Sequence, residues 1–132
     1  MSQEKVETVR RGFEQFLATG EVPWDLFDES VEIHDHDTPD QTDYRGHEGY
    51  ARWLEEWGAA WADWSMQIER HIDAGDSVVT FFLMQTTGLG SGIEMTREDA
   101  LVYRLRDGKI VRGDYYNDRS LALKTVGLAE SV

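Results

Sequence analysis

Three short glycine-containing turns in the second half of the chain constrain its fold more than any other feature. They lie at 73–76, 88–92 and 107–108, and they separate four runs of strand-like composition, which are 64–72, 77–87, 93–106 and 109–117. Glycine reaches the positive φ that tight hairpin turns require. Three successive hairpins predict an antiparallel meander of four strands.

Two longer stretches carry apolar residues at helical spacing. The first, over 3–19, ends at Gly20, which is typical of a helix C-terminus. The second presents one stripe of large side chains, namely Tyr50, Trp53, Leu54, Trp57 and Trp61. A helical turn over 23–27 and a last helix over 119–126, with Asp118 as N-cap, complete the expected helices. We expect the tryptophans to pack on the sheet, with one or two lining a pocket.

The stretch 30–36 alternates and predicts a fifth strand, followed by a loop over 37–46. One face of this strand carries Glu32, His34 and His36, and the other carries Val31, Ile33 and Asp35.

Length and charge limit the kind of protein. With 132 residues and 40% hydrophobic content, we expect one domain over 1–132. The formal charge of -13 repels phosphate backbones, so we expect no nucleic-acid partner. The chain has no cysteine for a disulfide, thiolate metal site or nucleophile. It has no membrane-length apolar run and no secretory signal at its start, so we expect a cytoplasmic protein without a membrane partner.

Four phrases resemble the SnoaL-like, polyketide cyclase-type branch of the nuclear transport factor 2-like or ketosteroid isomerase-like superfamily. They are Leu-Phe-Asp-Glu-Ser-Val-Glu-Ile-His at 26–34, Tyr-Arg-Gly-His-Glu-Gly-Tyr at 44–50, Gly-Ser-Gly-Ile-Glu at 90–94 and Leu-Arg-Asp-Gly-Lys-Ile-Val at 105–111. The resemblance covers residues 3–128. It implies an α+β, cystatin-like fold, in which a curved, mostly antiparallel sheet wraps around helices to form a cone with one internal pocket.

His34 and Asp99 are the candidate catalytic residues. The resemblance matches His34 with the carboxylate base of ketosteroid isomerases, and an imidazole with a pKa of about 6.5 can take and return a proton. If 106–108 forms a three-residue loop, Asp99 lies opposite Tyr115 on an inward face. A carboxyl group in an apolar pocket has a raised pKa and can serve as acid, base or orienter of the histidine. The alternative is a histidine that only lines the pocket.

The expected substrate-binding residues are Phe13, Glu32, Trp57, Arg97, Tyr103, Tyr115 and Asn117. The same register places Arg97 opposite Asn117. An alternative without chemistry is an ion pair of Arg97 with Asp99 or Glu32.

The resemblance also marks departures. Phe13 and Leu101 match the oxyanion-hole tyrosine and the protonated aspartate of the ketosteroid isomerases, so we do not expect that activity. Limonene epoxide hydrolases carry an Arg and two Asp at positions that match Phe82, Met84 and Tyr115 here. None of the three is retained, so we do not expect epoxide hydrolysis by that mechanism. The acid-base histidine of SnoaL-type cyclases has no counterpart on the last strands.

No cofactor is expected. His34 and His36, with Glu32 or Asp99, are an alternative metal-binding set, but we expect no metal because no third ligand is fixed.

Three functions remain open at this stage. The first is a cofactor-independent lyase, isomerase, cyclase or hydrolase acting on a small hydrophobic, carbonyl-bearing or cyclic molecule. The second is a domain that binds such a molecule without turnover. The third is a homodimeric association module that uses the outer face of the last strands, which carries Ala100, Val102, Ile110 and Tyr116 with Arg104, Arg112 and Asp114.

Overall fold

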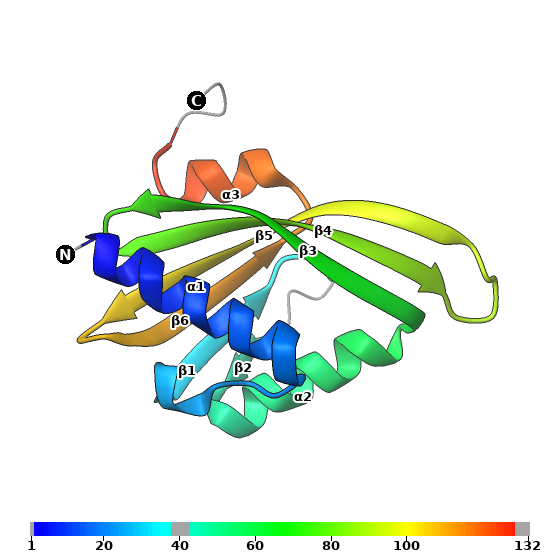
Figure 1. Cartoon of the computed structure of the whole chain (residues 1–132), viewed down its shortest axis with the longest axis horizontal. Coiled ribbons are helices and arrows are strands. Elements are labelled where there is room, and N and C mark those ends of the chain that lie inside the picture. The colour runs from blue at the N-terminus through cyan, green and yellow to red at the C-terminus, as the bar shows by residue number, and fades with distance from the viewer. Residues whose placement is uncertain (1, 38–42, 129–132) are drawn as a thin grey trace.

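The computed structural model describes residues 2–37 and 43–128 and contains one curved sheet with helices on both faces (Figure 1). The elements are α1 (Ser2–Thr19), the 3-10 turn η1 (Trp24–Leu26), β1 (Phe27–Asp35), β2 (Asp43–Arg45), α2 (Gly46–Ala59), β3 (Trp61–Ala74), β4 (Ser77–Gly88), β5 (Glu94–Arg106), β6 (Lys109–Tyr116) and α3 (Arg119–Thr125). The strand order is β2-β1-β6-β5-β4-β3. The expected α+β fold is confirmed.

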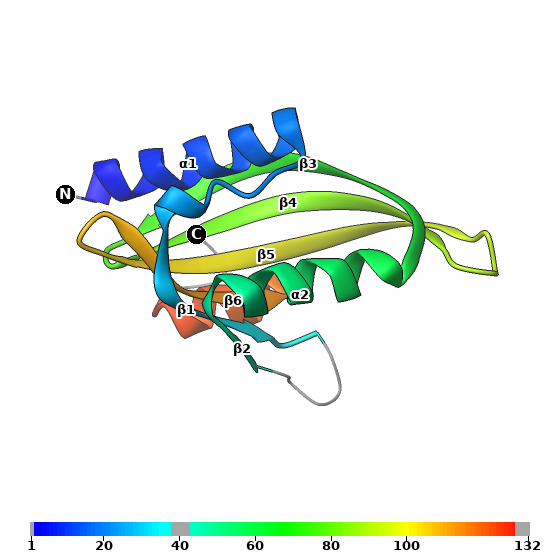
Figure 2. The same ribbon diagram turned by 90° about the horizontal axis from the view of Figure 1, so that it is seen from below.

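The sheet is antiparallel except for one pair, β1 with β6, which run parallel. Strands β3 to β6 form the meander that the turns predicted. Helices α1 and α2 lie on its concave side, as Figure 2 shows, and contribute to the main apolar core. Helix α3 packs on the opposite face over a second, smaller apolar cluster.

The hairpin between β5 and β6 corrects the predicted register. Arg106 pairs with Lys109, so the loop has two residues, Asp107 and Gly108, with φ of 53° and 77°. Positive φ at both positions fits the type I′ turn that matches strand twist. A bulge between Arg104 and Leu105 shifts the ladder further, so that Tyr115 faces Leu101 instead of Asp99.

Strand β1 shows the alternation that its sequence predicted. Val31, Ile33 and Asp35 are buried, whereas Glu32 and His34 lie on the other, convex face. Because successive side chains of a strand point to opposite faces, the apolar Val31 and Ile33 fix the inward direction.

Two boundaries differ from the sequence prediction. The short strand β2 lies within the stretch predicted as a loop, where it pairs with β1; the part of that stretch at 38–42 lies outside the described residues. Helix α2 ends at Ala59, and Trp61 begins β3 instead of continuing the helical stripe. Within the described residues, no helix is long and apolar enough to cross a membrane.

The outer sheet face is partly covered by the chain's own last helix. Asp118 caps α3 by accepting hydrogen bonds from the backbone N–H groups of Ser120 and Leu121, as predicted. Beneath α3, a cluster buries Ala100, Val102, Tyr116 and Ala122. Ile110, which we expected on this face, belongs to the main core, because the bulge turns it inward. The homodimer expected through this face stays a prediction.

Substitution of Gly113 can test the close approach of β1 and β6. A Cβ at Gly113 would lie 2.7 Å from Ile33 Cδ1 and 2.8 Å from Tyr103 Cε1. We predict that Gly113→Ala lowers the free energy of unfolding by about 1–3 kcal/mol, because the core must shift to accept the methyl group. Urea denaturation measures the change.

The matched control is Gly12→Ala inside α1, where the new Cβ would meet Leu26 Cδ1 at 3.5 Å, an ordinary contact. Its expected effect is neutral or stabilising by up to about 1 kcal/mol. Equal effects of the two substitutions would contradict the close approach.

Candidate functional site

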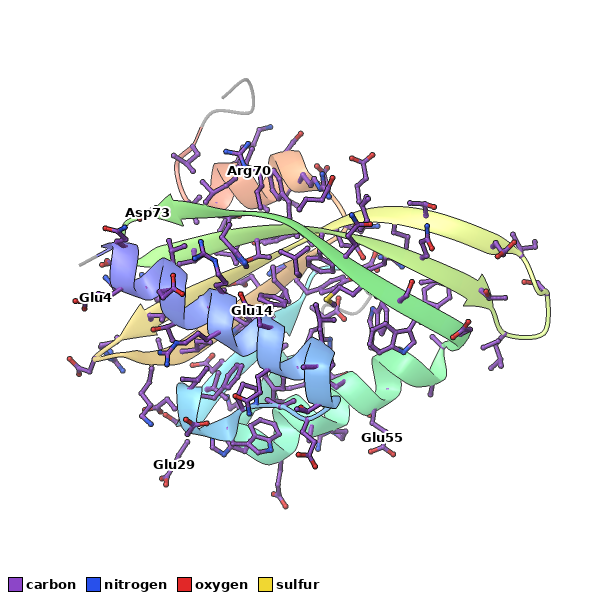
Figure 3. The ribbon with its side chains drawn as sticks, in the orientation of Figure 1. Glu4, Glu14, Glu29, Glu55, Arg70 and Asp73 are labelled. Atoms are coloured by element: carbon purple, nitrogen blue, oxygen red, sulfur yellow. The ribbon has the colours of Figure 1, made fainter. Side chains whose placement is uncertain are left out.

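An apolar cavity of about 320 Å³ lies between the concave sheet face and helices α1 and α2. Its lining is almost wholly aliphatic or aromatic and includes Val9, Phe13, Phe16, Val22, Pro23, Phe27, Tyr50, Trp53, Leu54, Trp57, Trp64, Met66, Phe82, Met84, Leu101, Tyr103, Ile110 and Tyr115. The lining residues exposed to solvent are Gly20, Glu55 and Trp64, near the C-terminal ends of α1 and α2 and the start of β3. The cavity therefore opens there, and Glu55 points outward from α2 at this rim (Figure 3).

Two tyrosine hydroxyls meet within the cavity lining. Tyr50 from α2 and Tyr103 from β5 are hydrogen-bonded to each other at 2.5 Å, and both residues are buried. Burial raises the pKa of Tyr50 to about 12, despite the opposing effect of its hydrogen bond. Burial also raises the pKa of Tyr103 well above 10. Both hydroxyls therefore keep their protons at neutral pH.

A second polar group lies directly behind the lining. The Tyr115 hydroxyl donates to Asp99, whose side chain is fully buried. Arg97 Nε donates to the same carboxyl group at 3.4 Å, and the Arg97 guanidinium also pairs with Asp37 at 2.5 Å. Burial raises the pKa of Asp99 above its ordinary value, although the hydrogen bond from Tyr115 and the charge of Arg97 oppose the rise.

Asp35 is a buried carboxylate that the sequence analysis did not select. It is 3% exposed and accepts a hydrogen bond of 2.8 Å from Trp53 Nε1 and one of 2.9 Å from the Asp37 backbone N–H. The parallel register of β1 and β6 sets it beside Tyr115. The sequence pattern that could have identified Asp35 is the alternation of β1, since Asp35 shares the face of Val31 and Ile33.

The structure places four of the predicted substrate-binding residues in the cavity lining; they are Phe13, Trp57, Tyr103 and Tyr115. It brings Arg97 and Asp99 together behind that lining in the ion pair that was the alternative to a role in binding or catalysis. Asn117 is exposed, because β6 ends at Tyr116 and the chain leaves the sheet there toward α3.

Glu32 and His34 lie outside the cavity, which corrects their predicted positions. His34 Nδ1 lies 2.7 Å from Asp43 Oδ1, and its Nε2 lies 3.1 Å from Glu32 Oε1, so both ring nitrogens contact carboxyl groups on the convex face. Because successive residues of a strand point to opposite faces, His34 faces away from the cavity and its neighbour Asp35 faces inward.

His36 lies on the same convex face. Its Nε2 is 2.8 Å from Asp114 Oδ1, and its ring stacks on that of Tyr116. Across the part of the chain that the structure describes, no three His, Asp or Glu side chains are grouped as metal ligands would be.

The curved sheet and the helices on its concave face, with an apolar cavity between them, form the fold of nuclear transport factor 2-like proteins. The chain belongs to the family of SnoaL-like domains, whose model matches residues 21–113. The resemblance found in the sequence is thereby confirmed. No curated protein matches the chain.

Solved structures with this fold are distant in sequence. A nuclear transport factor 2-like protein of unknown function from Burkholderia pseudomallei is 17% identical, with a TM-score of 0.72 over 94% of this chain and 98% of its own. TerC, co-crystallized with polyporic acid, is 18% identical, with a TM-score of 0.73 over 93% of this chain and 98% of its own. A protein with a ketosteroid isomerase-like fold from Catenulispora acidiphila, in complex with trimethylamine, is 21% identical, with a TM-score of 0.62 over 82% of each chain. These similarities establish the fold.

Two buried aspartates predict opposite titrations within one molecule. We expect the Asp99 carboxyl group to titrate above 3.8 and that of Asp114 below it. Burial would raise the pKa of Asp114 too, but hydrogen bonds from Arg112 and His36 outweigh burial there. Tyr115→Phe should raise the pKa of Asp99 further, since it removes a donor to the ionised form. Carboxyl carbon-13 NMR over a pH series measures both groups.

The control is Tyr116→Phe, which removes the hydroxyl bonded to Thr125 Oγ1 on the other sheet face. It should leave the Asp99 titration unchanged.

The titration of Asp99 also makes stability depend on pH. The folded state holds the Asp99 proton more tightly than the unfolded chain does, so Asp99 favours folding most at acid pH. This contribution is lost as the pH rises through the folded pKa. A midpoint for Asp99 below that of Asp114 would contradict the assignment.

Proposed function

We propose that this chain binds a mainly apolar, ring-containing small molecule in the cavity between its sheet and helices α1 and α2. The observation that carries the proposal is the cavity itself, whose volume of about 320 Å³ falls within the range of ligand pockets. Its lining offers ring faces and aliphatic side chains, and its few polar groups are tyrosine hydroxyls and the rim residue Glu55.

The arrangement of the rings supports an aromatic or cyclic ligand. Tyr115 contacts Trp53, Trp57 and Phe82 with ring centroids 5.7, 6.5 and 6.2 Å apart. Such tilted and edge-to-face groups present both ring faces and ring edges to a bound molecule. The relatives co-crystallized with polyporic acid and in complex with trimethylamine are consistent with small-molecule binding by this fold.

A second candidate function is acid–base catalysis on the bound molecule, as a lyase, isomerase or cyclase. The observation that favours it is the pair of buried carboxyl groups, Asp35 and Asp99, on either side of Tyr115. Asp99 has a raised pKa, so it can hold a proton nearer to neutral pH than an exposed aspartate can. Tyr115 lies between Asp99 and the cavity and is the group through which a proton would reach the ligand.

Filling the cavity tests the binding proposal. We predict that Leu54→Trp weakens the binding of 2-isopropylnaphthalene by at least about tenfold, because a larger side chain in the lining removes space for the ligand. Binding is measured by the change in tryptophan fluorescence. The matched control, Leu121→Trp, replaces an exposed leucine on α3 and should bind as the wild type does. If the folded wild-type protein binds no member of a series of neutral bicyclic compounds, the binding proposal is wrong.

Proton exchange tests the catalytic candidate separately. We predict that the protein accelerates exchange of the α-protons of 2-tetralone in D₂O, measured by NMR. Asp99→Asn and Asp35→Asn should each reduce the acceleration by about 100-fold or more, the usual contribution of a general acid or base. Asp76→Asn, which changes a carboxylate whose side chain is 83% exposed, should have no effect. If the protein binds 2-tetralone but does not accelerate the exchange of its α-protons, the catalytic candidate is wrong and the binding proposal stands.

A further inference from the structure

The Tyr50–Tyr103 pair has one more proton than its own hydrogen bond uses. Each hydroxyl carries one proton, and one of the two donates to the other at 2.5 Å, in either direction. The receiving hydroxyl then still holds its own proton. Within residues 2–37 and 43–128, neither hydroxyl has a further hydrogen-bond partner. One donor of the pair is therefore left without an acceptor from the described protein.

The surroundings of the pair make this donor unusual. The ring of Tyr50 is flanked by Phe27 and Trp53, with centroids 4.8 and 5.6 Å away, and the ring of Tyr103 is flanked by Phe13 at 6.0 Å. Tyr50 and Tyr103 are only 5% and 4% exposed. Buried polar groups in native proteins nearly always have a partner, so a lone donor in such a place calls for an explanation.

Both tyrosines line the cavity, so an acceptor can reach the pair from a ligand. Their raised pKa values keep both protons in place, so the pair remains a donor throughout the neutral pH range. A donor that itself accepts a hydrogen bond is polarised by it and binds an acceptor more strongly.

We propose that the Tyr50–Tyr103 hydroxyl pair is a subsite for an uncharged acceptor oxygen on the ligand, such as the carbonyl oxygen of an aryl ketone. The inference rests on the proposed function, because it specifies which ring-containing molecules the cavity selects. An apolar cavity alone would bind a hydrocarbon more tightly than a ketone of the same shape, because the ketone would lose its hydrogen bonds to water. The hydroxyl pair adds a preference for the ketone.

The test compares two probes of nearly equal shape, 2-acetylnaphthalene and 2-isopropylnaphthalene, which differ in whether they carry a carbonyl oxygen. The ratio of ketone affinity to hydrocarbon affinity should be about tenfold higher for the wild-type protein than for the double variant Tyr50→Phe with Tyr103→Phe. The double variant should favour the hydrocarbon, because its cavity offers the carbonyl oxygen no tyrosine hydroxyl. The double variant is needed because either single substitution leaves one hydroxyl with a free proton. Tyr116→Phe, which removes a tyrosine hydroxyl on the other sheet face, should keep the wild-type ratio.

Infrared difference spectroscopy provides a second measurement that needs only the wild-type protein. The carbonyl stretching frequency of bound 2-acetylnaphthalene should lie below its value in hexane, as expected for a hydrogen-bonded carbonyl. A ketone-to-hydrocarbon affinity ratio that is the same in the wild-type protein and the double variant, or a stretching frequency equal to that in hexane, would each overturn the inference. Failure of 2-isopropylnaphthalene to bind at all would instead count against the proposed apolar pocket.

Discussion

The parallel pairing of β1 with β6 is the contact on which the rest of the structure depends. It is the sheet's one parallel pair, and it joins the first half of the chain, with α1, η1, β2 and α2, to the antiparallel meander. The two strands can meet because Gly113 has no side chain where Ile33 and Tyr103 fill the space. With this contact made, the inward rows of β1, β5 and β6 face α1 and α2 across one cavity, and Asp35 lies beside Tyr115.

Local sequence was sufficient to predict most elements of this fold. Helix α1, the four strands of the meander and the cap of α3 follow from spacing, turn residues and one N-cap, all of which act within a few residues. The bulge at Arg104 and Leu105 has no such local signature, and it moved every residue of β6 beyond it relative to β5. Asn117 was misplaced because β6 ends one residue before it.

The site was harder to predict than the fold. The alternation of β1 identified its two faces correctly. Matching by resemblance selected His34, which faces outward. The apolar residues Val31 and Ile33 were the better indication of which side chains of this strand face inward, and Asp35 shares their face. Contacts between segments that are distant in the chain could not be predicted from the sequence. Tyr50 and Tyr103 are 53 residues apart, and Trp53 and Asp35 are 18 apart, so these hydrogen bonds exist only once α2 has packed on the sheet.

If the cavity binds a ligand as proposed, the charge of the protein and the chemistry of its cavity would together select for the ionisation state of that ligand. The chain carries a net charge of -13, and among the described residues that line the cavity none is a lysine, arginine or histidine. A carboxylate or phosphate ligand would therefore be repelled at a distance and would find no counter-ion at the end of its path. A weak acid would enter as its neutral form, so its apparent affinity would fall about tenfold for each pH unit above its own pKa. Selection by this protein would thus begin with the protonation equilibrium of the ligand in solution, before any contact is made.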